Sequence, residues 1–353
     1  AGGNMEYLIE APHELQVIGD YDVVVAGGGV AGVCAAIGAS RAGAKTAIIE
    51  RYGYAGGLAT GGLVILLVGL SNNNKTLIKG ICEEIIYRLE KTGSIRRVGP
   101  HVLFDPESMK YILDCMILEN NIIPYYHCFV ANTIGSEGWI SGIVTESKSG
   151  RRVIKARVFV DATGDADIAK YTNTPFDMEK TMDLMPVTMG FRVGGINISK
   201  ISDYFAQNPD KYIEILEKNG CSTKIGGWIQ TIHNNEAWFN IAHVENIDIT
   251  NIKHLSDAEI KGREIVQKLM TSLTKEIPGF EHGYLIDTNA QLGGRDSRRI
   301  KGVYRYTKND YMKDFEDTIA LNPEYTVTQR GYAKIPYRCL ISPNSKNTIW
   351  AGR

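Results

Sequence analysis

Three glycines near the N-terminus have a spacing that can bind the pyrophosphate of a dinucleotide. Gly27, Gly29 and Gly32 form the pattern G-x-G-x-x-G. The first glycine permits a tight turn, the second lets the main chain approach a phosphate, and the third lets a helix pack closely on a strand. The N–H groups at the start of that helix would bind the phosphates. The spacing therefore predicts a dinucleotide site.

An acidic side chain follows at the distance that a ribose requires. Glu50 stands 21 residues after Gly29. Its carboxylate can accept hydrogen bonds from ribose hydroxyls, and its charge disfavours a 2′-phosphate. A glycine pattern alone is weak evidence, so the elements around it decide its value.

The elements that would position these residues are a strand, a helix and a second strand. Asp22–Ala26 is a short β-branched run, typical of a strand buried on both faces. Val33–Ala42 has a helical pattern that ends at Gly43, and Lys45–Ile49 is a second strand that leads into Glu50. We therefore interpret the N-terminus as a dinucleotide-binding βαβ unit.

Two further segments favour FAD over NAD as the ligand. The segment 51–62 is dense in glycine and offers bare main chain to a large, flat or phosphorylated ligand. Much later, residues 156–167 read as a strand that runs into a turn of small residues. The carboxylates of Asp165 and Asp167 in this turn are equally well interpreted as caps of a following helix.

Several motifs resemble a known family, and they occur in its order. They are GGGVAG, ERYGYAGGLATGG, VDATGDADIA, LMPVTMGFRVGG, AQLGGRDSRRI and IPYRCLI. Together they resemble the glutathione-reductase-type FAD superfamily, and more closely a subfamily described as FAD-dependent oxidoreductases. The resemblance extends from about Tyr21 to the end of the chain.

The resemblance implies both a fold and a cofactor. The fold would be α/β: a Rossmann-like, three-layer (ββα) FAD/NAD(P)-binding domain with an inserted α+β substrate domain. Glu50 would hold the ribose, and Arg51 would lie near the adenine. Val130, on a strand predicted at Tyr125–Ala131, would contact the adenine through its main chain. The other implied FAD-binding residues are Gly27, Gly29, Val30, Ala31, Gly32, Gly57, Leu58, Ala59, Thr60, Ala162, Thr163 and Gly164.

The family pattern also sets an expectation for the C-terminus. Members usually continue after a strand carrying AGR into a flavin-contacting loop and a final helix, whereas this sequence stops at Arg353. We therefore expect the segment that completes the flavin half of the site to lie beyond Arg353. Full FAD occupancy of the chain as given would depend on it.

The pattern changes near Pro175, which divides the chain. We assign 20–174 to the FAD-binding domain with a helical insertion at about 74–120, 175–334 to the substrate domain, and 335–353 to a return into the FAD-binding domain. Asp105-Pro106 predicts the start of one helix. Ser256–Glu259 is a capping box that predicts the start of a long helix, whose apolar face includes Ile260, Val266, Leu269, Met270 and Leu273.

Arg295 is the first candidate for a catalytic residue. A guanidinium can hold an anionic substrate or stabilise the negative charge of a reduced flavin. The alternative is a structural ion pair with Asp296 or another carboxylate, and the sequence does not separate the two. Arg192 and Tyr337 are weaker candidates. The isolated His101, His233 and His243 could act as general bases, but a lone histidine is more often structural.

Other features limit the possible functions. Trp238 and Phe239 could line a pocket, although core packing is the simpler interpretation. The six cysteines form no CxxC pair, which favours free thiols in a reducing compartment, and no pattern of metal ligands is present. The formal net charge of −1 does not indicate a nucleic-acid or membrane partner. The short basic clusters, including 298–301, are interpreted as solvated surface charge. We expect no metal, nucleic acid or membrane partner, a cytoplasmic location and, as an open option, a homo-oligomer.

Three functions fit these observations. The first is an FAD-dependent oxidoreductase that transfers a hydride or two electrons between flavin and a small organic substrate. The second is an NAD-dependent dehydrogenase, which the loop after Glu50 and the turn at 162–165 argue against. The third is a non-catalytic flavin-binding or electron-transfer subunit.

Overall fold

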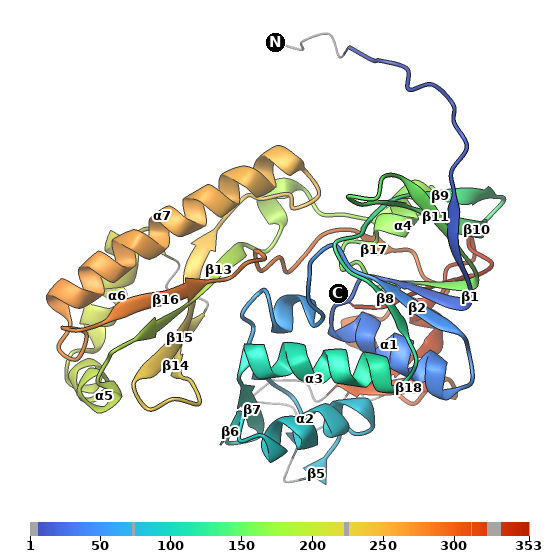
Figure 1. The fold of residues 1–353 in the computed structure, drawn as a ribbon. Coiled ribbons are helices and arrows are strands. Elements are labelled where there is room, and N and C mark those ends of the chain that lie inside the picture. The colour runs from blue at the N-terminus through green and yellow to red at the C-terminus, as the bar shows by residue number, and fades with distance from the viewer. Residues whose placement is uncertain (1–5, 73–74, 222–225, 312, 323–332, 353) are drawn as a thin grey trace.

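The chain forms two lobes in the computed structural model, which describes residues 6–72, 75–221, 226–311, 313–322 and 333–352 (Figure 1). One lobe carries α1 and the largest sheet. The other carries a smaller sheet and the long helix α7. Residues 6–16 extend away from the body as an arm without helix or strand.

The largest sheet has seven strands and holds the βαβ unit that the sequence predicts. β8, β2, β1, β11 and β20 run parallel, and β9 and β10 continue from β11 as an antiparallel meander. The first residues of β11 pair with β10 and its last three pair with β20. The strands are β1 (Val17–Ala26), β2 (Thr46–Ile49), β8 (Ile123–Tyr125), β9 (Phe129–Ser136), β10 (Trp139–Glu146), β11 (Arg152–Asp161) and β20 (Thr348–Trp350).

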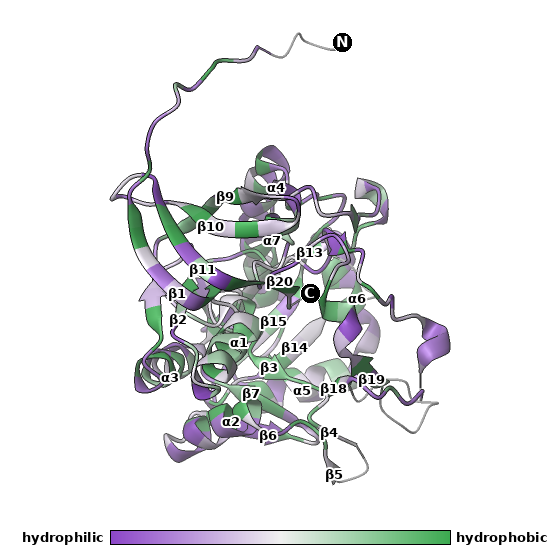
Figure 2. Ribbon diagram, turned by 90° about the vertical axis from the view of Figure 1, so that its right-hand side faces the viewer, coloured by the Kyte–Doolittle hydropathy of each residue, from purple (hydrophilic) through white to green (hydrophobic). Residues whose placement is uncertain are grey.

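Two hydrophobic clusters cover the two faces of the parallel strands. On one face Val25 and Ile48 pack with apolar residues of α1 (Val30–Arg41), α2 (Ile81–Lys91) and α3 (Pro106–Glu119). On the other face Val24 and Ala26 pack with residues of the meander and with Ile168 of α4 (Asp167–Tyr171). Figure 2 shows α1 as largely hydrophobic. The predicted three-layer α/β fold is therefore confirmed.

The ends of the N-terminal helices follow their sequence signals. Asp105 caps α3, because its side chain accepts a hydrogen bond of 2.7 Å from the Ser108 N–H, and Pro106 is the first helical residue. Gly43 has φ +91 just after α1 and donates to the Ser40 carbonyl oxygen, as expected of a glycine that ends a helix.

The strand predicted at Tyr125–Ala131 is wrong. β8 ends at Tyr125, and β9 starts only at Phe129, after a turn in which His127 has φ +51. Main-chain hydrogen bonds tie both sides of this turn to Glu50, from the Glu50 N–H to the Tyr125 carbonyl and from the Cys128 N–H to the Glu50 carbonyl. The turn lets the chain pass from β8, which pairs with β2, to β9, which pairs with β10.

Shorter strands lie outside the main sheet. The region 74–120 contains α2 and α3, as predicted, but also an antiparallel hairpin that pairs with β3. The predicted boundary at 334/335 falls inside a strand, β19. These elements are β3 (Leu66–Leu67), β4 (Ser71–Asn72), β5 (Lys75–Thr76), β6 (Ile95–Val98), β7 (His101–Phe104), β12 (Phe176–Asp177), β17 (Arg299–Ile300), β18 (Thr318–Asn322) and β19 (Ala333–Pro336).

The second lobe is a four-stranded antiparallel sheet covered on one face by helices. Its strand order is β14–β15–β13–β16, and its apolar face packs on α7, with Gly262 fitting closely against Met189. These elements are β13 (Val187–Gly194), β14 (Gly227–Gln230), β15 (Glu236–Val244), β16 (Tyr284–Thr288), α5 (Ile198–Gln207), α6 (Pro209–Lys218) and α7 (Ile252–Glu276). The region thus combines helices with an antiparallel sheet, and its role as a substrate domain stays a prediction.

The start of α7 differs from its prediction. The helix begins one turn earlier than Ser256, and Asn251 caps it by accepting hydrogen bonds from the N–H groups of Lys253 and His254. Ser256 lies inside the helix, where its hydroxyl donates to the Ile252 carbonyl. Of the predicted apolar face, Val266, Leu269, Met270 and Leu273 are buried, but Ile260 is exposed.

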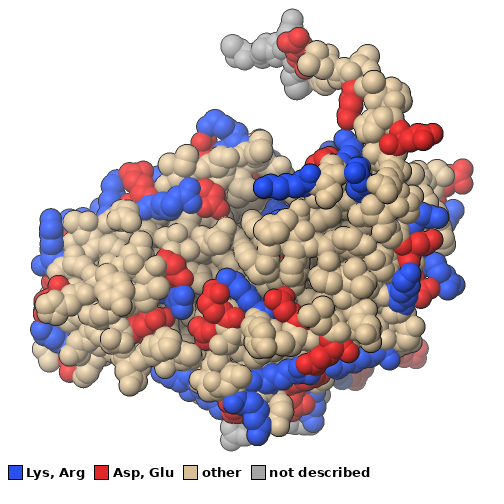
Figure 3. Space-filling view, in the orientation of Figure 1, with Lys and Arg blue, Asp and Glu red and all other residues tan. Residues whose placement is uncertain are grey.

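Charged side chains of both signs are interspersed over the face of the molecule seen in Figure 3. In the part of the chain that the structure describes, no helix combines the length and apolarity needed to cross a membrane. The six cysteines are free thiols. No cluster of three or more His, Cys, Asp or Glu side chains among the described residues is arranged to hold a metal ion.

Candidate cofactor-binding site

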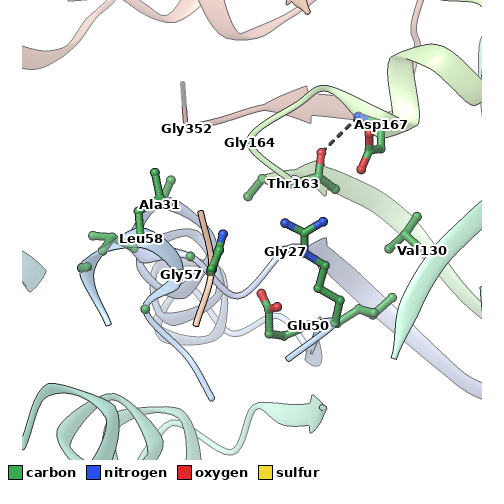
Figure 4. Close-up of a pocket in the computed structure, with 18 of the residues that line it drawn as sticks. Gly27, Ala31, Glu50, Gly57, Leu58, Val130, Thr163, Gly164, Asp167 and Gly352 are labelled. Carbon is green, nitrogen blue, oxygen red and sulfur yellow. Dashed lines mark hydrogen bonds between the residues drawn. The ribbon is translucent and has the colours of Figure 1, made fainter. Parts of the chain in front are cut away.

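A cavity of about 440 Å³ opens at the carboxyl ends of β1 and β2 and extends to the turn after β11 (Figure 4). Ligands of open parallel sheets bind at this edge. The sequence-predicted residues that line the cavity are Gly27, Gly29, Val30, Ala31, Glu50, Arg51, Gly57, Leu58, Ala59, Val130, Ala162, Thr163 and Gly164.

The three glycines of the pattern each meet a different steric demand. Gly27 has φ +103, and a Cβ there would collide with the Ala162 carbonyl. A Cβ on Gly32 would collide with the Gly27 carbonyl, where α1 crosses β1. A Cβ on Gly29 would have no atom within 4 Å, because this position faces the cavity. Gly29 therefore leaves room for a ligand, whereas Gly27 and Gly32 hold the unit together.

Glu50 is buried at the end of β2 and is fixed by main-chain donors. Its carboxylate accepts hydrogen bonds from the N–H groups of Gly28 at 2.7 Å and Tyr52 at 2.9 Å. Burial raises the pKa of Glu50, and these two hydrogen bonds and the nearby Arg51 oppose the rise. The carboxylate thus has a fixed orientation at the cavity wall (Figure 4).

The turn after β11 is held by Asp161, which the sequence analysis did not single out. Asp161 is fully buried and accepts hydrogen bonds from the Thr163 N–H and hydroxyl and from the Ile168 N–H. The Thr163 hydroxyl in turn accepts from the Asp167 N–H at 3.0 Å, the contact drawn in Figure 4. Asp161 and Thr163 therefore satisfy the first N–H groups of α4.

The interpretation of Asp165 and Asp167 as caps of α4 is wrong. Asp165 accepts a hydrogen bond from the Ser297 hydroxyl at 2.7 Å, and Asp167 forms an ion pair of 2.8 Å with Arg298. Arg298 is largely buried and is not the solvated surface charge that its basic cluster suggested. These contacts tie the segment after β16 to the cavity wall.

Two predicted residues do not line the cavity. Gly32 lies at the helix–strand contact, and the buried Thr60 hydroxyl donates to the Ala55 carbonyl and so fixes the glycine-rich loop. The other lining residues were not predicted from the sequence. Gly56, Cys128, Phe129 and Asp167 are close in sequence to predicted positions, so that closeness could have found them. Cys34 also lines the cavity, and its place one helical turn after Val30 could have indicated this. The remaining lining residues are Ile49, Gln291 and Gly352.

Arg295 does not line the cavity, although Gln291, four residues earlier, does. Its Nη2 donates to Thr188 Oγ1 at 3.0 Å and to Asn240 Oδ1 at 3.2 Å, on the face of the second sheet opposite α7. The alternative ion pair with Asp296 is not formed, since the carboxylate of Asp296 instead lies 3.9 Å from Arg299. Burial lowers the pKa of Arg295.

The weaker candidates have structural partners or lie apart. Arg192 is buried in an ion pair with Asp287, with donor distances of 3.0 and 2.6 Å, and it also contacts Glu236 at 3.4 Å. Tyr337 is partly exposed in a short 3₁₀ turn. His101, His233 and His243 do not line the cavity. Phe239 belongs to the core under α7, whereas the Trp238 side chain packs against the first lobe.

Comparison with known proteins identifies the group to which this fold and cavity belong. The family model of FAD-dependent oxidoreductases matches residues 22–353. The chain belongs to this family. The FAD-dependent oxidoreductase match covers both lobes, so the second sheet is part of the family architecture. Among curated proteins, none matches the chain in sequence.

Solved structures share the fold of this FAD-dependent oxidoreductase at low sequence identity. A p-nitrophenol 4-monooxygenase from Pseudomonas putida has a TM-score of 0.51 at 11% identity, over 82% of this chain and 71% of its own. A geranylgeranyl bacteriochlorophyll reductase-like protein from Thermoplasma acidophilum has a TM-score of 0.50 at 14% identity, over 79% and 66%. A myxobacterial FAD-dependent halogenase has a TM-score of 0.50 at 12% identity, over 81% and 66%. The chain thus spans about two thirds of the length of these structures.

FAD is the cofactor of this family, and the geometry of the cavity fits it. The observation that tests the fit is Gly29, which leaves the space that a pyrophosphate needs at the N-terminus of α1. The buried Glu50 carboxylate and the bare main chain at Gly56–Gly57 border the same space. A phosphate-bearing, elongated ligand is thus compatible with the cavity on steric grounds.

Proposed function

We propose that this protein is an enzyme that transfers a hydride or two electrons between FAD and a small organic substrate. The observation that carries the proposal is the cavity, whose wall includes Glu50, Gly29, Leu58, Ala59 and Gln291, the last from the segment after β16. Bound there, FAD would supply the redox chemistry, and the protein would supply binding and orientation.

Each end of the cavity would hold a different part of the cofactor. Glu50 would accept the ribose hydroxyls, with Arg51 and Val130 near the adenine. The N–H groups at the start of α1 would bind the pyrophosphate. Gly57, Leu58 and Ala59 would lie along the cofactor between its pyrophosphate and its flavin ring. Ala162, Thr163 and Gly164 would close the adenosine half.

The substrate would lie where the two lobes meet. The Gln291 N–H donates to the Gly61 carbonyl at 3.1 Å, so the segment after β16 contacts the glycine-rich loop directly. The buried polar atoms Trp238 Nε1 and Asn289 Oδ1 on this side have no hydrogen-bond partner among the described residues. Because unsatisfied buried polar atoms are costly, these atoms are suited to bind a ligand.

Arg295 remains the proposed catalytic residue on this side of the sheet. Among the described residues it forms no ion pair that would explain a partly buried arginine, and its partners Thr188 and Asn240 are neutral. Arg192 has such an explanation in its ion pairs with Asp287 and Glu236. Arg295 is thus the better candidate to meet negative charge on a substrate or on a reduced flavin.

An absorption spectrum followed by anaerobic reduction tests this function. The purified protein, reconstituted with FAD, should show a flavin spectrum that bleaches with a reductant and recovers with an electron acceptor. Gly29→Val is the control and should remain colourless. A wild-type protein that takes up no flavin would contradict the cofactor assignment. A bound flavin that no reductant or substrate bleaches would favour a non-catalytic flavin-binding protein.

A further inference from the structure

We propose that the substrate carries a carboxylate and that Arg295 binds it on the polar face of the second sheet, beside the cofactor cavity. This proposal rests on the function proposed above and names the substrate class for the same site. It derives from a cation and a buried histidine, each without a charge or hydrogen-bond partner of the required kind among the described residues, and from the course of the segment 291–298.

Arg295 is a cation that no described acidic residue pairs with. No carboxylate lies within 4.0 Å of its guanidinium among the residues that the structure describes. Its neighbours differ, since Arg298 pairs with Asp167 at 2.8 Å and Arg299 pairs with Glu179 at 2.6 Å. Among the described residues, acids therefore pair with the adjacent arginines and none pairs with Arg295.

Such an arrangement costs stability unless a ligand completes it. Arg295 is partly buried, and its only hydrogen bonds to described residues come from Nη2, to two neutral oxygens. Nε and Nη1 remain as donors in the planar geometry that matches a carboxylate. A guanidinium keeps its charge even when burial lowers its pKa, so the cation persists and attracts an anion.

His243 adds a second polar group that has no role in the fold. It lies opposite Thr188 across β13 and β15 and is only 4% exposed. Its ring lies near the Ile241 main chain, but neither nitrogen makes a contact of hydrogen-bond geometry with a described residue. Burial and the nearby Arg295 lower its pKa to about 4, so the ring stays neutral and can donate one N–H to an anion.

The segment that carries Arg295 borders the cofactor cavity at both ends. Gln291 lines the cavity, and Arg298 binds Asp167, which lines it too. Between them, Gly293 and Thr188 exchange two main-chain hydrogen bonds of 3.0 Å, which fix the segment to β13. The segment that carries Arg295 is therefore anchored to the cavity wall on both sides of the arginine, and we place the bound anion on this stretch.

Carboxylates and their neutral amides are the probes that test the charge requirement. FAD-loaded protein is titrated at constant ionic strength with acetate and benzoate and, separately, with acetamide and benzamide. Flavin absorbance and melting temperature report binding. We expect at least one carboxylate to bind tenfold or more tightly than its amide. Equal affinity for acid and amide, or no binding of either carboxylate, would overturn the proposal.

Two variants assign the effect to Arg295. Arg295→Gln should weaken carboxylate binding at least tenfold. Asn240→Asp keeps the arginine but places a carboxylate at the atom that already accepts from it, and it should weaken binding by a similar factor. Arg299→Gln, on the same segment and already paired with Glu179, is the matched control and should leave binding unchanged. Unaltered carboxylate affinity in both Arg295→Gln and Asn240→Asp would overturn the assignment.

Flavin content separates the two possible failures. It is measured in every preparation before the titrations. A wild-type protein without flavin would contradict the proposed function, and the melting-temperature titration would still report carboxylate binding. A protein that holds flavin but shows no carboxylate preference would contradict only the present proposal.

Discussion

At the residue scale, the two glycines Gly29 and Gly32 separate ligand binding from folding. They are three residues apart, yet a Cβ at the first would enter the cavity and a Cβ at the second would strike the Gly27 carbonyl. The same substitution therefore has different physical consequences at the two positions, and this difference can be measured.

Gly29→Val should abolish FAD binding without unfolding the protein. The valine side chain would occupy the space for the pyrophosphate, and its Cβ would have no atom of the chain within 4 Å. Gly32→Ala should instead lower the free energy of unfolding by about 1–3 kcal/mol, because α1 must move away from β1. Flavin absorbance and chemical denaturation measure the two effects. Normal flavin content in Gly29→Val would refute the placement of the pyrophosphate.

Asp161 sets a pH dependence of stability. Burial raises its pKa to about 6, against the opposing effect of its three hydrogen bonds. The unfolded value is near 4, so the folded chain binds this proton more tightly. The contribution of Asp161 is therefore greatest at low pH and is lost as the pH rises from about 4 to 6.

Asp161→Asn should therefore have an effect that varies with pH. An amide cannot accept from all three donors, so the variant should lose about 1–3 kcal/mol of stability. Its deficit relative to the wild type should be larger at pH 5 than at pH 7.5, because the wild type loses stability over that range. Denaturation at both pH values measures the deficit, and a larger deficit at pH 7.5 would contradict the raised pKa.

At the element scale, α7 shows how an earlier cap in the sequence overrides a later capping signal. Ser256–Glu259 has a local capping signal, but the helix extends back to Ile252 because Asn251 supplies a cap before it. The extra turn adds main-chain hydrogen bonds, and Ser256 then serves as an ordinary helical residue.

Two alanine substitutions distinguish the two caps of α7. Asn251→Ala should destabilise the protein by about 1 kcal/mol, because two N–H groups at the helix start lose their acceptor. Ser256→Ala should change stability by less than about 0.5 kcal/mol, since alanine is favourable inside a helix. Chemical denaturation measures both. A larger loss of stability in Ser256→Ala than in Asn251→Ala would instead support Ser256 as the N-cap of α7.

At the scale of the whole molecule, the cofactor cavity is built from segments far apart in the chain. Gly29, Val130, Thr163, Gln291 and Gly352 all line it. The contact between Gln291 and Gly61 joins the second lobe to the cofactor loop. A ligand in this cavity therefore touches most of the architecture, and its binding should stabilise the entire fold.

FAD should raise the melting temperature of the apoprotein. At a free concentration of about 100 times its dissociation constant, linkage gives about 2.7 kcal/mol. For a chain of this size, that corresponds to a rise of about 3–4 °C. Differential scanning calorimetry with and without FAD measures the shift. Gly29→Val is the control and should show no shift, and an equal shift in both proteins would mean that FAD binds elsewhere.

The sequence by itself determined the βαβ unit, the acid after its second strand and the family, because these depend on local spacing. Turn glycines, a strand, a helix and Glu50 are all set within about thirty residues. Their motifs also placed most of the cavity wall correctly in advance.

Only the tertiary structure decided which polar residues share a space. It assigned Arg192 to a buried ion pair, tied Asp167 to Arg298, and placed Arg295 near His243 with no described carboxylate in ion-pair contact. These pairings join residues that lie up to 131 positions apart. Local patterns cannot specify them, because the packing of two lobes determines which charges meet and which stay available to a ligand.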